Sequence, residues 1–419
     1  MSWVLNSQRT EKSAIVKVVP GFNKLLGTSI DDSAARLSHV YSVYVLLIFA
    51  VVVSTSQFVG NPIHCLIPLL DIKDSSYQKY IENLCWVANT YYVSFNEGEF
   101  PVDKIERSAK HITYYQWVPL LLVIQMFLFK LPNVIWVLLH AYGGLSLSGL
   151  VKSVAEINEI DPKDRENVIS NLGSQIDRWL EVQKLYKRNS CINAISAISR
   201  YFVCLCNKRN GTFLTGLYLF TKLVYAGSVI GQFFVLNAFM ATNYTMYGYE
   251  VLNSLLSKRP WRDSPRFPTV TFCDFEIRQL QNVQTFTVQC VLPANLFNEK
   301  VFIFMWFWLS LVTLVSVFSL LKWLYISTYK PSNLRYVKKY RTIVGKFPLR
   351  TERRLFKRFV HQYLRDDGVF VLRMLARNTT DIVIALLIDN LWQNYVGQQK
   401  RQLKNGSWSK NETNQLASD

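Results

Sequence analysis

The sequence Tyr114-Tyr115-Gln116-Trp117-Val118-Pro119 lies where a polar segment ends and a long apolar run begins. Two Tyr and one Trp within four residues are typical of a helix that enters a bilayer, because their rings join an apolar body to a polar tip at headgroup level. Pro119 falls in the first turns of the run, where a missing N–H group costs least. The stretch therefore predicts the start of a membrane-spanning helix that is anchored at one interface.

The composition of the whole chain also indicates a membrane protein. Of its 419 residues, 50% are hydrophobic, 14% are aromatic and only 18% are charged, with a net charge of +18. A soluble domain usually carries about 25% charged residues. A nucleic-acid-binding protein can be equally basic but does not carry long apolar runs, so no nucleic-acid partner is expected. Residues 1–39 contain no cleavable signal sequence, and the first apolar run is expected to act as signal and anchor.

Four apolar runs are each long enough to cross a bilayer, because 20 helical residues extend about 30 Å. The predicted spans are residues 40–59, 114–139, 212–240 and 301–326. We therefore predict an all-α membrane protein with four transmembrane helices. The intervening segments are 1–39, 60–113, 140–211, 241–300 and 327–419, the last with a disordered tail from about residue 397.

Basic residues predict the orientation of these spans. Residues 1–39, 140–211 and 322–419 hold 34 Lys and Arg, whereas residues 61–113 and 241–300 hold 11. Because segments rich in Lys and Arg stay on the cytoplasmic side, both termini and the middle loop are predicted to be cytoplasmic. The loops at 60–113 and 241–300 are predicted to be extracellular.

The cysteine distribution agrees with this topology. Of seven Cys, two lie in each predicted outer loop, and the other three lie in the predicted cytoplasmic loop. The outer four are Cys65, Cys85, Cys273 and Cys290. An oxidising exterior predicts disulfides among these four, with three pairings open. The spacing lacks the tight pairs of a zinc site, so no metal ion is expected.

Two features within the spans have structural and functional interpretations. Gly227 and Gly231 share one helix face and predict close helix packing there. Lys222 is either a functional charge inside the membrane or a residue on the cytoplasmic part of a longer helix. The second interpretation is favoured.

No catalytic motif is recognisable, and the spans contain no Asp or Glu, which disfavours a membrane enzyme and a proton-coupled carrier. No cofactor is expected. A four-span subunit can still enclose an aqueous path as one member of a ring. The residues proposed to line such a path belong to the polar end of the first span and to the amphipathic N-terminal segment: Ser54, Ser56, Gln57, Trp3, Arg9 and Lys12.

Several ordered motifs resemble the innexins, the gap-junction proteins of invertebrates. The string Tyr114 to Val118 is similar to the innexin signature at the start of the second span. The first outer loop contributes Asn61-Pro62-Ile63 and Cys85-Trp86-Val87, and the second contributes Cys273-Asp274-Phe275 and Thr287-Val288-Gln289-Cys290. The resemblance covers about residues 20–375.

The resemblance implies a function and an assembly. Subunits are expected to form an octameric hemichannel, to dock with a hemichannel of the apposed cell, and to pass ions and small molecules at gap junctions of the plasma membrane. Mixed oligomers with other innexins and contacts with membrane lipids are also implied. The implied disulfides are Cys65–Cys290 and Cys85–Cys273, bracing outer loops with some β structure. The N-terminal segment would line the pore, and the cytoplasmic loop and C-terminal helices would form a dome.

The outer loops depart from the family pattern at several positions. Leu66 follows the first cysteine where an aromatic residue is common, and Thr285-Phe286 replaces a basic pair. The alternatives are therefore a non-docking hemichannel, as in the pannexins, that releases small metabolites, and an auxiliary scaffold subunit. A glycan at Asn243, the only sequon in a predicted outer loop, would favour the first alternative, a hemichannel that does not dock.

Overall fold

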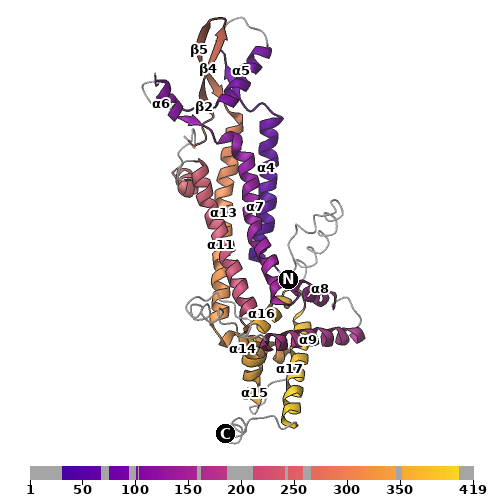
Figure 1. Ribbon diagram of the computed structural model, residues 1–419. Coiled ribbons are helices and arrows are strands. Elements are labelled where there is room, and N and C mark those ends of the chain that lie inside the picture. Colours follow the sequence, from indigo (N-terminus) through magenta and orange to yellow (C-terminus); the bar gives the residue numbers. More distant parts are fainter. Residues whose placement is uncertain are drawn as a thin grey trace. The chain divides into compact units, whose positions relative to one another are not determined.

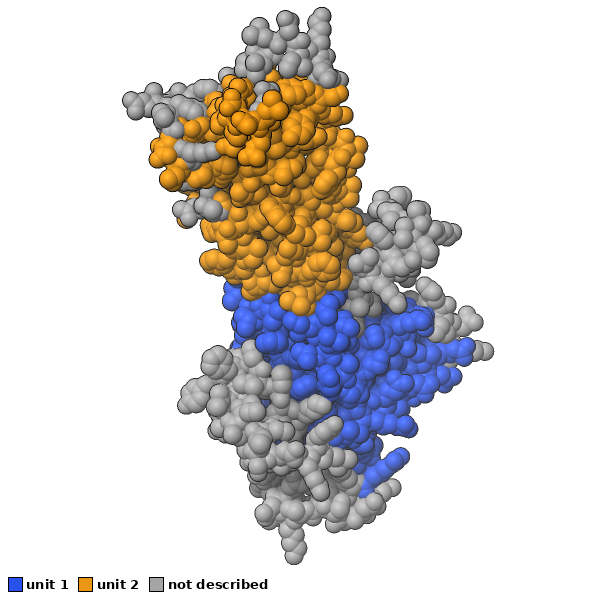
Figure 2. Space-filling view, turned by 45° about the horizontal axis from the view of Figure 1, so that its top comes forward, with its two compact units in different colours: residues 1–33, 133–224, 317–419 blue, residues 34–132, 225–316 orange. Residues whose placement is uncertain are grey.

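The computed structural model describes residues 31–67, 75–93, 101, 103–157, 162–185, 211–240, 244–257, 266–345 and 352–404. The chain forms two compact units, and each is built from segments far apart in sequence (Figure 2). Unit 2 consists of residues 34–132 and 225–316, and unit 1 consists of residues 1–33, 133–224 and 317–419.

Among the described residues, four helices are long and apolar enough to cross a membrane, as the sequence predicts: Ser33–Phe58, Tyr115–Gly143, Phe213–Met240 and Pro293–Thr328. The first comprises α3 (Ser33–Arg36), η1 (Leu37–Tyr41) and α4 (Ser42–Phe58). The second comprises η2 (Tyr115–Trp117), α7 (Val118–His140) and η3 (Ala141–Gly143). The third is α11 (Phe213–Met240) and the fourth is α13 (Pro293–Thr328).

The first and fourth helices begin earlier than the apolar runs indicate. α13 starts at Pro293, eight positions before the predicted span, because proline favours the first helical position and the polar residues that follow tolerate a helix. α7 continues through Pro132, although proline removes one backbone donor there. Apolar periodicity locates the part of a helix that faces lipid or core, and it does not mark where the helix ends.

The core of unit 2 contains side chains of all four long helices. Leu46, Leu122, Val229 and Met305 are among its fully buried members. Polar bonds also join the helices: Trp308 Nε1 donates to Ser42 Oγ at 2.9 Å, and Ser228 Oγ donates to the Leu128 carbonyl at 3.1 Å.

The loop residues of unit 2 form short helices and one sheet. The helices are α5 (Ser75–Ala88), α6 (Lys104–Ala109), η5 (Tyr244–Met246) and α12 (Tyr247–Leu256). The strands are β1 (His64–Leu66), β2 (Thr90–Tyr91), β3 (His111–Ile112), β4 (Val270–Gln279) and β5 (Asn282–Val291). α12 packs closely on α13, since a Cβ atom added to Gly248 would overlap the Trp306 ring.

Unit 1 is helical throughout its described part. Besides the ends of α7, α11 and α13, it contains α8 (Leu147–Glu156), α9 (Pro162–Leu185), α14 (Pro331–Ile343), α15 (Arg353–Arg358), η7 (Phe359–Leu364), α16 (Arg365–Leu375) and α17 (Asp381–Lys404). α17 extends to Lys404, beyond residue 397 at which the sequence predicts the start of a disordered tail. These helices share one extensive apolar core, in which Phe359 packs on Trp392 with ring centroids 5.2 Å apart.

Candidate functional site

The two loops of unit 2 are built into a single sheet. The strand order is β1-β5-β4-β2-β3, so strands from residues 60–113 flank a long hairpin from residues 241–300. β4 and β5 pair antiparallel over their whole length, from Val270–Val291 to Gln279–Asn282. β-branched and aromatic residues alternate with polar residues along both strands, which suits a half-buried ribbon. Figure 1 shows α5 beside this hairpin.

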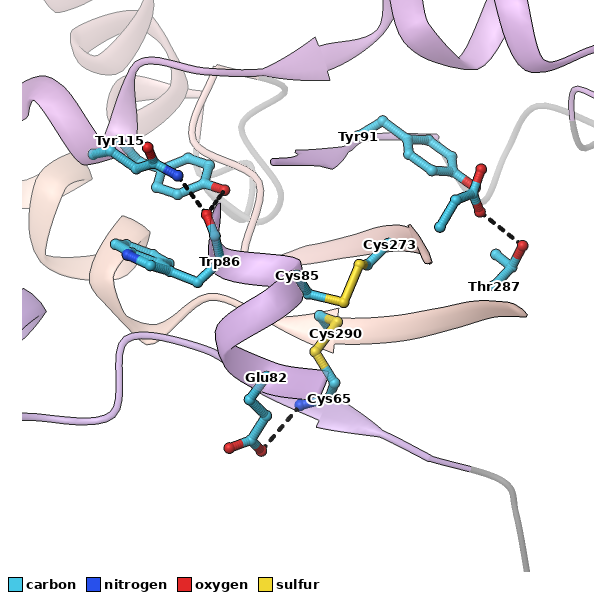
Figure 3. The surroundings of a disulfide bond; sticks show 11 residues. Cys65, Glu82, Cys85, Trp86, Tyr91, Tyr115, Cys273, Thr287 and Cys290 are labelled. Atoms are coloured by element: carbon cyan, nitrogen blue, oxygen red, sulfur yellow. Dashed lines mark hydrogen bonds between the residues drawn. A yellow bond between two sulfur atoms is a disulfide. The ribbon is translucent and has the colours of Figure 1, made fainter. Parts of the chain in front are cut away.

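Two disulfides join the loops (Figure 3). Cys65 of β1 bonds Cys290 of β5, its direct partner in the strand register. Cys85 of α5 bonds Cys273 of β4. These are the two pairs that the family resemblance implies. All four residues are buried, in a small core that also contains Ile81 and Val288.

Each bridge constrains a long stretch of chain. The bonded cysteines are separated by 225 and 188 positions in the sequence. Cross-links of that span are expected to stabilise the folded chain by about 3–5 kcal/mol each, because they lower the entropy of the unfolded chain. The sulfur atoms of Cys65, Cys85 and Cys290 lie within 4.8 Å of one another, but each belongs to a disulfide and supplies no thiolate for a metal ion.

Asp274 is a second, polar connection between the loops. Its carboxylate accepts hydrogen bonds from the Tyr91 hydroxyl at 3.0 Å and the Thr287 hydroxyl at 2.7 Å. It also pairs with Arg107 at 2.8 Å, and both side chains are less than one-fifth exposed. Burial, more than the neighbouring charges, raises the pKa of Tyr91 to about 12, so this residue remains a donor at physiological pH. Four elements, β2, α6, β4 and β5, therefore converge on one carboxylate.

The stretch Tyr114 to Pro119 connects this sheet to the helices. Tyr114 donates to the Arg266 carbonyl at 2.6 Å, and Tyr115 is 1% exposed beside Trp86, with ring centroids 4.7 Å apart (Figure 3). Gln116 Nε2 donates to the Trp86 carbonyl. Only Trp117 remains substantially exposed, at 57%. The stretch therefore fixes both loops where they meet the second span, and Trp117 alone has the exposure of an interfacial anchor.

The polar end of the first span packs against the start of the second. Gln57 is 6% exposed, and its Nε2 donates to the Tyr115 carbonyl at 2.7 Å. In the single subunit it is therefore a packing residue that binds α4 to the second span, and its pore-lining role stays a prediction. A buried amide needs a hydrogen-bond partner, and the nearby helix start offers one. Ser54 and Ser56 are partly exposed and remain pore-lining predictions.

Lys222 is a buried and paired charge near the start of α11. Its side chain is 3% exposed and forms a salt bridge with Asp32, immediately before α3. The other carboxylate oxygen of Asp32 accepts from Ser319 Oγ at 3.1 Å, and neighbouring Asp31 accepts from Asn133 Nδ2 at 3.4 Å. The residues that precede the first span are thereby tied to α7, α11 and α13. We call Asp31, Asp32 and their partners Asn133, Lys222 and Ser319 the N-terminal anchor.

Gly227 and Gly231 do not pack on another helix within the part of the chain that the structure describes. Apart from the backbone of their own helix, no heavy atom of the described residues lies within 4 Å of a Cβ atom built on either glycine. Gly227 is exposed and Gly231 is partly exposed, so the face that they share is open in the single subunit. The spacing correctly predicts a shared helix face, but it cannot indicate which surface packs on that face.

Some sequence predictions fall on residues that the structure does not describe. These are the pore-lining candidates Trp3, Arg9 and Lys12, the sequon at Asn243, and the three cysteines Cys191, Cys204 and Cys206.

Sequence reasoning missed Asp32, Asp274 and Arg107. A signal for Asp32 was available, because a lone acidic pair before the first span complements the single lysine inside the third. Asp274 lies in a recognised motif, yet nothing in its local sequence reveals contacts with residues more than 160 positions away.

Comparison with known proteins gives a consistent result. The sequence model of the innexin family matches residues 31–395. Innexin unc-9 of Caenorhabditis elegans is 35% identical over 365 residues, which cover 87% of this chain and 92% of that protein. Innexin-19 of Caenorhabditis briggsae is 32% identical over 87% of this chain and 86% of its own length. Innexin-10 of C. elegans is 32% identical over 94% of this chain and 70% of its own length.

Proposed function

We propose that the disulfide-braced sheet is the surface through which this protein docks with a channel of the apposed cell. The premise is that the chain belongs to the innexin family and is thus a multi-pass membrane subunit of oligomeric gap-junction channels. The observation that carries this proposal is the union of both loops in one sheet by two disulfides and by Asp274. A surface that is rigid before contact loses little entropy when it binds an apposed channel. Family membership also indicates a channel protein without enzymatic activity.

In the proposed topology both termini are cytoplasmic and the sheet is extracellular. The support is the 34 Lys and Arg of the three segments assigned to the cytoplasm, against 11 in the two loops. The disulfides also favour an oxidising side for the loops. Epitope tags inserted after Gly98 and at the C-terminus test the topology: antibodies should reach only the first tag on intact cells. Labelling of the C-terminal tag without permeabilisation would reverse the orientation.

We further propose that eight subunits form the ring, in line with the family resemblance, and that mixed rings with other innexins also assemble. Residues 1 to about 22 would line the narrowest part of the pore, and the N-terminal anchor would hold the chain at residues 31 and 32. In such a ring each pore-facing charge occurs eight times, so Arg9 and Lys12 would favour anions. Reversal potentials in asymmetric KCl test this, and a firm cation preference would contradict it.

The experiment that tests the docking surface removes one disulfide at a time. The variants Cys65→Ser with Cys290→Ser, and Cys85→Ser with Cys273→Ser, are compared with Cys204→Ser and Cys206→Ser as a control. Junctional current between paired cells is expected to be lost in both disulfide variants and retained in the control, at equal surface delivery. Normal junctional current in both disulfide variants would refute the bracing role.

A further inference from the structure

The exposed face of α13 carries a continuous apolar stripe. Large exposed side chains recur at intervals of three and four residues, which places them on one side of the helix. They are Phe304, Phe307, Leu311, Leu314, Phe318 and Leu321. In a membrane-spanning helix such a stripe is suited to contact lipid acyl chains.

The exposed side chains keep the same three- and four-residue spacing beyond the stripe, but they are now aromatic or cationic. Lys322, Tyr325 and Tyr329 are exposed at the next positions of this face. The two tyrosine rings are stacked with centroids 5.4 Å apart, and the Arg335 guanidinium lies 5.0 Å from the centre of the Tyr329 ring. Aromatic and cationic side chains following an apolar stripe are typical of the boundary between hydrocarbon and headgroups.

α14 extends this cationic boundary. Arg335, Lys338 and Lys339 lie on its exposed side, whereas Val337 and Tyr340 are buried in the core of unit 1. The helix contains no acidic residue. Lys339 approaches Asp381 at 3.7 Å, but both side chains are about 60% exposed, and such surface pairs contribute little. An exposed positive face therefore lies next to the end of a membrane span.

We propose that Lys322, Arg335, Lys338 and Lys339, which we call the α13–α14 basic surface, bind the headgroups of anionic phospholipids in the cytoplasmic leaflet. The charge is complementary, and the cations continue from an apolar, lipid-facing stripe through two interfacial tyrosines. An acidic peptide would match the charge but would not account for this continuity. The inference rests on the proposed orientation, because anionic lipids are concentrated in the cytoplasmic leaflet.

The test uses the full-length assembly reconstituted into vesicles of phosphatidylcholine with spin-labelled phosphatidylserine or spin-labelled phosphatidylcholine. The wild type is expected to concentrate the anionic label at its surface, with a preference that weakens as salt rises. Arg335→Gln with Lys338→Gln should lower that preference by about fivefold for each cation removed. The matched control, Lys400→Gln with Arg401→Gln, removes the same charge from the exposed end of α17 and should retain the preference.

Two further double variants complete the test. Arg335→Lys with Lys338→Arg preserves the charge and should bind the anionic label like the wild type. Lys322→Gln with Lys339→Gln replaces the first neutral variant if that variant does not assemble. An absent preference in the wild type, or an equal one in wild type and neutral variants, overturns the proposal. Binding of an acidic peptide by the wild type without any lipid preference overturns it too. Vesicles with identical leaflets need neither docking nor a fixed orientation, so failure here is separable from failure of the proposed function.

Discussion

At the scale of single residues, Gln57 changes how the end of the first span is understood. Polar residues near the end of an apolar run can equally line water or satisfy a neighbouring backbone group. The structure favours the second role, because in the single subunit the amide is buried and reaches the Tyr115 carbonyl at 2.7 Å. Ser54 and Ser56 lie on a more exposed part of the same turn and keep the first interpretation.

We expect Gln57→Leu to lower stability by about 1–3 kcal/mol, because a buried carbonyl loses its donor. Single-channel conductance should be unchanged. The measurement is thermal unfolding of the purified assembly together with conductance, with Ser56→Ala as the control on the same helix. Altered conductance at unchanged stability would instead indicate that Gln57 lines the pore.

Asp367 provides a pH-dependent prediction. Its buried carboxylate accepts from the Thr215 amide at 2.9 Å and the Thr215 hydroxyl at 3.0 Å, at the start of α11. Burial raises the pKa of Asp367 to about 6, although these hydrogen bonds oppose the shift. Because the folded pKa exceeds the unfolded value of 3.8, this group stabilises the fold at low pH, and that contribution disappears as pH rises through 6.

The contribution of Asp367 should fall by roughly 1 kcal/mol between about pH 5.5 and pH 7.5. Asp367→Asn removes the titrating group, so its unfolding temperature should depend less on pH than that of the wild type over this range. Glu156→Gln, at an exposed position of α8, should leave the wild-type dependence intact. An unchanged pH profile in Asp367→Asn would contradict the assignment.

At the scale of elements, the N-terminal anchor determines how the first helix begins. Lys222 is 3% exposed on its side chain, and removing one member of a buried ion pair leaves the other charge without compensation. The salt bridge, Ser319 and Asn133 together restrain the chain that leads into the pore-lining segment of the proposed channel.

Asp32→Asn is expected to destabilise the assembly by about 3–5 kcal/mol and to reduce surface delivery. The double variant Asp32→Asn with Lys222→Met should recover part of that loss, because it removes the uncompensated charge. Unfolding temperature and surface biotinylation measure both effects. Equal loss in the single and double variants would show that the pair is not coupled.

Replacement by alanine is expected to have different effects at Gly248 and at Gly231. Gly248→Ala should impair folding, since its Cβ would overlap the Trp306 ring, and the adjacent helices α12 and α13 would have to separate. Gly231→Ala has open space within the subunit and should fold normally. Size-exclusion profiles of the two purified variants distinguish the cases. Loss of the assembled peak in Gly231→Ala, with an intact subunit, would instead show that another subunit packs on that face.

At the scale of the whole molecule, the sequence predicts the four spans and the family because both depend on local signals. Apolar periodicity, basic asymmetry and ordered motifs are all readable along the chain. The packing of Gln57 and the convergence on Asp274 are not, since each joins residues from separate segments without a local signal. The pairing of the four cysteines required family resemblance, because spacing leaves three possibilities open.

The proposed channel needs only this chain, docked to its counterpart through the disulfide-braced sheet. Dual-cell recording of junctional current between two cells that express only this protein measures docking and conduction together. We expect junctional current between such pairs, and none when one cell expresses Cys65→Ser with Cys290→Ser. Surface delivery and single-cell current without any junctional current would contradict docking, and would leave a hemichannel that opens only to the cell exterior.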